Sequence, residues 1–260
     1  MAQATGEQIR ALCRSGEFDR PTAGVALGYA QANLVVLRSN AAREFEEFCR
    51  LNPRPCPVME VTRPGHYVPI RHAPGADLRT DLPRYRVLQR GACVDTPTSI
   101  CDHWDAECVA FLIGCSFTFE AALLKAGIPV RHIETDRNVP MYRTNVSCQP
   151  AGRFGGPLVV SMRPMTLRQA EAATAITDAY PHSHGAPILV GHPEKLGIAD
   201  LNRPDYGEAV SIDDDEMPVF WACGVTPIEI ILRAGLDFAV THEPGHMFVT
   251  DALDPSLRRL

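Results

Sequence analysis

The stretch FLIGCSFTFEAALLKAGIPVRH, residues 111–132, has the pattern of a strand, a turn, a helix and a second strand. Its first apolar run is typical of a buried strand and ends at Cys115. A helical segment follows and stops at Gly127, because glycine readily adopts the left-handed conformation that ends many helices. The last residues return to a strand pattern. The stretch therefore predicts one compact α/β unit.

A second stretch, PVFWACGVTPIEIILRAGLDFAVTH (residues 218–242), repeats this pattern. When Cys223 is placed over Cys115, the helix starts and helix ends also align, as the pairs Thr118 with Thr226 and Gly127 with Gly235. In the second unit, Thr226 is predicted to cap the helix. The two stretches therefore read as copies of one unit, with a chance match as the alternative.

The repetition predicts an α/β fold, with α+β as the alternative, in which two related lobes with mixed sheets surround a cleft. We place the first lobe at residues 1–150 and the second at residues 151–260. The first lobe includes a Pro- and Gly-rich connection at residues 63–83, which is long enough to be a functional loop.

Composition narrows the class of protein. The chain has 260 residues, 45% of them hydrophobic and 22% charged, with a net charge of −6. These values are typical of a globular protein, and no basic block favours nucleic acid or an anionic membrane as a partner. The longest apolar runs are too short to cross a bilayer, and the N-terminus lacks the apolar core of a signal peptide. We therefore expect a cytoplasmic location.

Nine cysteines are present, without a CxxC pair. The chain is too long for a disulfide-stapled miniprotein, so most of these cysteines are expected to be buried in a reducing compartment. Cys115 and Cys223 differ from the rest, because each is predicted to lie between a strand end and a helix start. A thiol at a helix N-terminus has a lowered pKa and is a better nucleophile or base. The alternative is that both are core residues.

Residues 242–246, His-Glu-Pro-Gly-His, match the letters of the HExxH zinc motif. That motif requires both histidines on one face of a helix. Proline and glycine in the middle oppose a helix, at a cost of about 3 and 1 kcal/mol. We therefore predict a strand that ends in a Pro-Gly turn, and no metal site. Glu243, His246 and His184 remain candidates for acid/base roles, with turn capping as the alternative.

A polar segment, NVPMYRTN (residues 138–145), is the candidate substrate-binding region. An arginine can hold a carboxylate with two parallel hydrogen bonds, and amides and hydroxyls can orient a polar substrate. Arg163, at the end of a predicted strand, is a second candidate anion clamp. The substrate-binding candidates are Asn138, Tyr142, Arg143, Thr144, Asn145 and Arg163. The alternatives are a polar turn and a surface arginine.

Seven segments spread over nearly the whole chain resemble the D-glutamate cyclase family. They are GYAQANLVVL, FLIGCSFTFEAALLKAG, VRHIETDRNVPMYRTN, GPLVVSMRP, DLNRPDYGEAV, PVFWACGVTP and THEPGHMFVTD. Bacterial members of this family are named hydro-lyases by similarity to a eukaryotic cyclase, which carries the region beside another domain. The resemblance implies loss of water from D-glutamate to give 5-oxo-D-proline, and a place in amino acid metabolism.

The implied reaction sets the roles that residues must fill. A cation must hold the α-carboxylate, and Arg143 is the first candidate. A base must take the ammonium proton and an acid must protonate the leaving oxygen. Cys115 or Cys223 is expected to act as a proton donor, because a thioester formed from a carboxylate without ATP is unfavourable.

Three other functions stay open. Paired thiols would also suit a racemase or epimerase, and a single cysteine would suit an amidase. The third alternative is a non-catalytic subunit that binds a small acid. The expected partner is a small carboxylic acid. No cofactor, nucleic acid or membrane is predicted, and a homodimer is left open.

Overall fold

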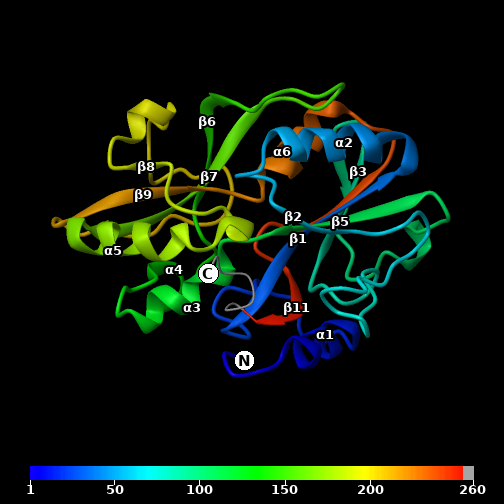
Figure 1. The fold of residues 1–260 in the computed structure, drawn as a ribbon, viewed down its shortest axis with the longest axis horizontal. Helices are drawn as coiled ribbons and strands as arrows, with labels where there is room; N and C mark the ends of the chain where they lie inside the picture. The colour runs from blue at the N-terminus through cyan, green and yellow to red at the C-terminus, as the bar shows by residue number, and fades with distance from the viewer. Residues whose placement is uncertain (254–260) are drawn as a thin grey trace.

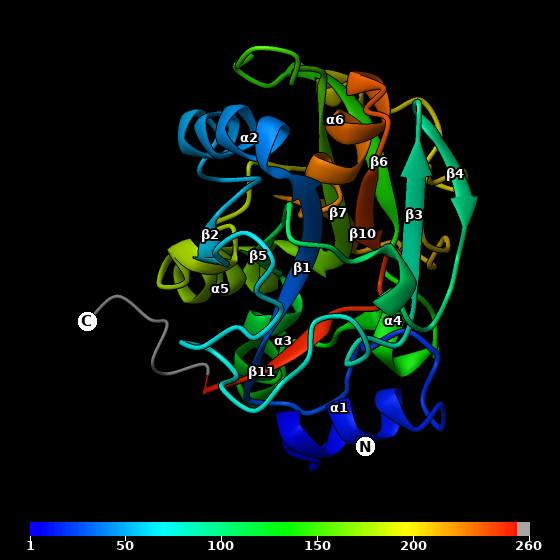
Figure 2. The same cartoon turned by 90° about the vertical axis from the view of Figure 1, so that its right-hand side faces the viewer.

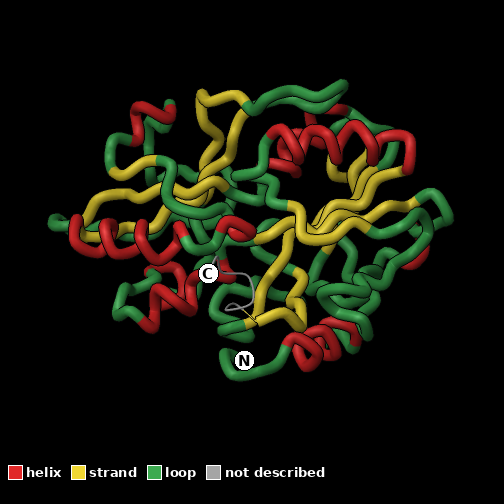
Figure 3. The backbone as a smooth tube through the Cα atoms, viewed as in Figure 1, coloured by secondary structure: helices red, strands yellow, loops and turns green. Residues whose placement is uncertain are grey.

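The structure, a computed structural model, describes residues 1–253. Two sheets lie side by side with helices on their faces (Figures 1, 2 and 3). The first sheet has the order β2 (Val58–Val61), β5 (Cys108–Gly114), β1 (Tyr29–Arg38), β10 (Ala239–His242), β3 (Tyr85–Gln89) and β4 (Ala92–Asp95), with β11 (Phe248–Leu253) paired to β1. The second has the order β6 (Met141–Ser147), β7 (Pro157–Thr166), β9 (Glu216–Ala222) and β8 (Leu189–Val190).

The predicted fold class is confirmed. The strand pairings in both sheets are antiparallel, which corresponds to the α+β alternative. The helices are α1 (Gly6–Arg14), α2 (Ser39–Leu51), α3 (Phe117–Lys125), α4 (Arg131–Glu134), α5 (Leu167–Asp178) and α6 (Thr226–Ala234). Short 3-10 turns are η1 (Cys101–His103), η2 (Pro181–Ser183) and η3 (Pro193–Leu196). None of the helices in residues 1–253 has both the length and the apolar character that crossing a membrane requires.

Each sheet contains a core of four strands, and the two cores have the same arrangement. In the first sheet this core is β2-β5-β1-β10, and in the second it is β8-β9-β7-β6. In each core, a long strand is followed by a helix and pairs with the strand that precedes a cysteine: β1 and α2 with β5, and β7 and α5 with β9. The repeat seen at the two cysteines therefore extends over both sheets.

The helix that follows each cysteine packs on the opposite sheet. α6 follows β9 of the second sheet, but Ile230 and Ile231 join α2 in the core of the first. α3 follows β5 of the first sheet, but Phe119 and Leu123 join α5 in the core of the second. Figure 1 shows α6 beside α2, and α3 beside α5. Both chain crossings pass through the cysteine turns, so the fold brings the two turns to the junction of the sheets.

Two details differ from the sequence analysis. The strand predicted at residues 128–132 does not form, since residues 128–130 are irregular and α4 begins at Arg131. Pro129 lacks the N–H that a central strand donates, which disfavours a strand here. The strand predicted after the second helix forms as β10, but it joins the first sheet. Conversely, β6 comes from the first half of the chain and joins the second sheet. Strand pairing thus crosses residue 150 in both directions, and the division at that residue stays a prediction.

Candidate active site

Cys115 and Cys223 lie in one buried cluster. Each follows the last residue of a strand, β5 or β9, and both pack with Val159, Met141 and Met247. The two thiols are close enough that the charge of Cys223 would raise the pKa of Cys115. The two copies of the repeat therefore place their thiols at a single site.

The two cysteine turns have the same hydrogen bonds. In each, the backbone N–H two residues after the cysteine donates to its sulfur, from Phe117 to Cys115 and from Val225 to Cys223, both at 3.5 Å. The hydroxyl oxygen of Thr118 accepts the N–H of Gln31 on β1 at 3.0 Å.

Thr226 makes the equivalent bond to the backbone of β7. Its hydroxyl oxygen accepts the N–H of Val159 at 3.0 Å, and its O–H donates to the C=O of the same residue at 3.2 Å. The prediction that Thr226 caps its helix is wrong, because the cap position is Val225 and the hydroxyl binds a strand instead. Each threonine therefore fastens a cysteine turn to a long strand.

Both thiols are protonated at neutral pH. Burial raises the pKa of Cys223 to about 11, although the N–H of Val225 and the charge of Arg163 lower it. Burial also raises the pKa of Cys115 well above its ordinary value. The expected lowering at a helix N-terminus is wrong here, because desolvation of the thiolate outweighs the dipole. Neutral thiols at this site are proton donors rather than nucleophiles.

Arg163 on β7 is the cation of the site. Its side chain is fully buried, and its guanidinium lies over the rings of Phe119 and Trp221. It donates to Ser116, the residue after Cys115, at 3.1 Å, and to Ser161 at 3.2 Å. We call the place where Cys115, Cys223 and Arg163 meet the thiol junction.

Glu120 on α3 neutralises this arginine. Its Oε1 accepts from Nη2 of Arg163 at 2.5 Å and from Nε at 3.1 Å. His132 Nε2 lies 3.0 Å from the same Oε1, without hydrogen-bond alignment. Burial alone would raise the pKa of Glu120, but its contacts with His132 and Arg163 outweigh burial and lower this pKa. Glu120 is therefore a buried carboxylate.

His184 follows η2 and is buried, near enough to Arg163 to be affected by its charge. Its Nδ1 lies 2.7 Å from the C=O of Arg54, while Nε2 has no hydrogen-bond partner in the described chain. Burial, assisted by the nearby charge of Arg163, lowers the pKa of His184 to about 4. The ring is therefore neutral at pH 7, and a neutral imidazole nitrogen can accept a proton.

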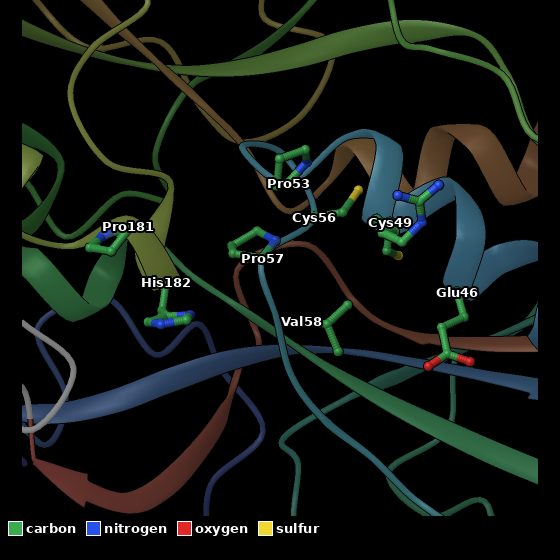
Figure 4. Close-up of a pocket in the computed structure, with 9 residues that line it drawn as sticks. Glu46, Cys49, Pro53, Cys56, Pro57, Val58, Pro181 and His182 are labelled. Atoms are coloured by element: carbon green, nitrogen blue, oxygen red, sulfur yellow. The ribbon is translucent and has the colours of Figure 1, made fainter. Parts of the chain in front are cut away.

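The turn η2 lies against the first cysteine turn. Gly114, just before Cys115, has no room for a Cβ because the C=O of His182 occupies that space. A pocket of about 470 Å³ lies outside this contact, between α2 and η2 (Figure 4). Its wall includes His182 and Pro57, whose C=O accepts the N–H of Gly114 at 2.9 Å. The backbone of Gly114 therefore lies between this pocket and Cys115.

Arg143, predicted as the carboxylate clamp, lies on β6 outside the thiol junction. Its guanidinium donates to Glu229 at 2.7 Å and to Asp205 at 2.8 Å, and it is 42% exposed. Two carboxylates thus already neutralise its charge.

The other candidates of residues 138–145 bond to the backbone or face solvent. Asn138 donates to the C=O of Pro244, Tyr142 to that of Leu201 and Thr144 to that of Leu158, whereas Asn145 is exposed. Of the predicted substrate-binding residues, Arg163 is the one at the thiol junction.

The HExxH letters form a strand end and a turn, as predicted. β10 ends at His242, and Gly245 has a φ of 87°. Glu243 is bound to Arg86 at 2.5 Å, and His246 lies 3.2 Å from the C=O of Pro244. Met247 of the same loop packs with both thiols. Within residues 1–253, no group of three or more His, Cys, Asp or Glu side chains is arranged to hold a metal.

Four residues near the junction were missed in the sequence: Glu120 and His132, together with Asn33, whose amide donates to the C=O groups of Ile113 and Gly114, and Ser183, the last residue of η2. Glu120 carried a usable signal, since it is the one charged residue in FTFEAALL, and a buried charge requires a partner. The other three are common residue types without a local pattern.

The fold and site define an α+β protein with two copies of one unit and a buried thiol pair. The model of the D-glutamate cyclase family matches residues 109–251. A "Putative hydro-lyase" of Stutzerimonas stutzeri is 54% identical over 96% of this chain and 94% of its own length. One of Rubrobacter xylanophilus is 56% identical over 95% of each chain, and "Putative hydro-lyase YcsI" of Bacillus subtilis is 51% identical over 96% and 98%. This chain therefore belongs to the D-glutamate cyclase family.

Among solved structures, a nitrogen repressor-like protein of Methanococcus jannaschii aligns over 95% of this chain and 98% of its own. The TM-score is 0.39 and the sequence identity is 7%, which is too low to support an argument.

Proposed function

We propose that this chain is a hydro-lyase that acts on a small amino or hydroxy acid at the thiol junction. The leading reaction is the dehydration of D-glutamate to 5-oxo-D-proline. The observation that supports it is that proton donors and a proton acceptor are buried near one cation, Arg163: two neutral thiols, and the unpaired Nε2 of neutral His184. Cytoplasmic location and a role in amino acid metabolism belong to the same proposal.

The reaction moves two protons from nitrogen to oxygen. The nitrogen of the substrate loses one proton to His184 and attacks the distal carboxyl carbon, so that a C–N bond forms. One carboxyl oxygen takes a proton from a thiol, and the C–O bond breaks. The second nitrogen proton completes the water molecule, and the histidine proton returns to the thiolate.

Arg163 replaces Arg143 in our assignment of the carboxylate clamp. The charge of Arg163 lies at the junction, where its carboxylate partner is Glu120, whereas Arg143 lies on β6 outside the junction and is held by Glu229 and Asp205. Holding the amine close to the distal carboxyl group would itself supply much of the rate.

Purified protein given D-glutamate should release 5-oxo-D-proline, followed by proton NMR. Cys115→Ser and Cys223→Ser should each slow the reaction at least tenfold. Cys148→Ser is the matched control, because Cys148 is buried in a different core. Full activity in both junction variants would refute the site, and no turnover of any glutamate-like acid would refute the substrate class.

A racemase or epimerase is the second candidate, favoured by the equivalent bonds around the two thiols. It predicts that solvent deuterium enters the α-carbon, which cyclisation leaves untouched. A cysteine amidase is disfavoured, because it needs a thiolate and burial raises the pKa of both thiols.

A further inference from the structure

One carboxylate oxygen at the thiol junction lacks a donor. Oε2 of Glu120 is buried and has no hydrogen-bond partner from residues 1–253. Burying an ionised oxygen without a donor is costly, and native structures rarely leave one so. We infer that Oε2 of Glu120 accepts the α-ammonium group of the substrate, so that the site takes amino acids and rejects hydroxy acids. The inference rests on the proposed substrate class and narrows it.

The other oxygen of Glu120 is fully used. Oε1 contacts both Arg163 and His132, which hold the carboxylate from one side. A carboxylate fixed in this way offers its remaining lone pairs in one direction. An ammonium group brings a positive charge and three N–H donors to them, whereas a hydroxyl brings one donor and no charge. Charge-assisted hydrogen bonds are about twice as strong as neutral ones, so the two substrates should be well separated in affinity.

Two further unpaired polar groups lie in the same buried region. His184 Nε2 and Ser183 Oγ are both buried without a hydrogen-bond partner in the portion of the chain that the structure describes. The helix α3, which carries Glu120, packs against η2, which carries Ser183. An ammonium group bound to Glu120 would thus lie in the region where the neutral imidazole can take its proton. Three unpaired polar groups in one buried region match a polar ligand better than an apolar one.

His132 is a positioning residue in this arrangement. Its ring stacks on Phe117 at 6.0 Å between centroids, and its side chain is 1% exposed. Because the ring is fixed, Nε2 stays 3.0 Å from Oε1 of Glu120 and leaves Oε2 without a partner in the described residues. His132→Gln should therefore weaken the preference for the ammonium without removing the carboxylate.

The test measures binding without turnover. Calorimetry measures how tightly the full chain binds D-glutamate, D-2-hydroxyglutarate and N-acetyl-D-glutamate. These ligands are the same diacid with an ammonium, a hydroxyl or an amide group on the α-carbon. We expect D-glutamate to bind at least tenfold more tightly than either of the others to the wild-type protein. Glu120→Gln should reduce that ratio to near one. His132→Gln should give an intermediate ratio.

Two results would overturn the inference. The first is equal binding of all three acids by the wild-type protein, which requires no variant to fold. The second is an unchanged preference in folded Glu120→Gln; if that variant does not fold, an unchanged preference in His132→Gln has the same meaning. Selective binding without formation of 5-oxo-D-proline would refute the proposed reaction but not the ammonium site.

Discussion

The side chain of Asn33 occupies the space where residue 224 would carry its Cβ, so the chain has glycine there. Asn33 lies on β1 of the first sheet, and Gly224 follows Cys223 at the end of the second. The amide of Asn33 also donates to the C=O groups of Ile113 and Gly114, at 3.1 and 2.8 Å. One asparagine thus contacts the turns of both cysteines.

Gly224→Ala should therefore destabilise the protein by roughly 3 kcal/mol, as overpacking of a core does. Urea unfolding measures the loss. Asn33→Ala in the same chain should recover part of it, because it removes the side chain that the new methyl group meets. Gly114→Ala is the control that Asn33→Ala should not rescue, since the obstacle there is the C=O of His182. If Asn33→Ala recovered the same share of stability in Gly224→Ala and in Gly114→Ala, the proposed contact between Asn33 and residue 224 would be contradicted.

Thr118→Val and Thr226→Val should cost similar amounts of stability. Each removes a hydroxyl that satisfies a buried backbone N–H, on Gln31 or on Val159. Leaving such a group unpaired costs about 1–3 kcal/mol. Chemical denaturation of the two variants compares the losses. A large loss in one variant and none in the other would argue against equivalent roles of the two threonines.

Arg163 and Arg143 should respond very differently to replacement. Arg163→Met breaks a buried ion pair and should cost about 3–5 kcal/mol, with loss of activity. Arg143→Ala removes a partly exposed pair and should cost less than about 1 kcal/mol, with activity within threefold of wild type. Unfolding curves and 5-oxo-D-proline formation measure both effects. A stable but inactive Arg143→Ala would return the clamp role to that residue.

Stability should fall as the pH drops from about 6.5 toward about 4. Burial lowers the pKa of His184 to about 4 and that of His242 to about 3. Both rings stay neutral in the folded protein, whereas the unfolded chain binds protons below its ordinary histidine pKa of about 6.5. The free energy of unfolding should therefore decline by up to about 1.4 kcal/mol per pH unit for each histidine. His184→Gln and His242→Gln should each reduce this slope. An unchanged slope would contradict the lowered pKa of the replaced histidine.

Thiol titration should separate the nine cysteines into two groups. Cys93 and Cys101 are exposed and seven others are buried. A disulfide reagent at pH 7.5 should modify the two exposed thiols first, because reaction needs both access and a thiolate. The remaining seven should react after denaturation in guanidinium. Rapid modification of Cys115 or Cys223 in the native protein, located by mass spectrometry, would contradict their raised pKa.

Local patterns were sufficient for much of the fold. Apolar runs predicted the strands before Cys115 and Cys223, and glycine predicted the end of the second helix, where Gly235 has a left-handed conformation. The Pro-Gly pair at residues 244–245 predicted a turn instead of a zinc-binding helix. These features depend on the backbone preferences of single residues and their neighbours, so a sequence carries them directly.

The site depended on contacts between distant residues. Glu120 and Arg163 are 43 positions apart, and only the packing of α3 on the second sheet brings them together. The same packing buries the thiols, which raises their pKa against the local effect of a helix start. Arg143 had the right chemistry for a clamp, but Asp205 and Glu229 reach it from other elements.

The sequence by itself determined the repeated unit, the α/β composition and membership of the D-glutamate cyclase family. Only the tertiary structure decided that each cysteine helix crosses to the opposite sheet and that Glu120 and Arg163 lie near the thiols. The physical reason is that burial and ion pairing depend on which apolar faces pack together, and many arrangements of the same elements satisfy the local patterns equally well.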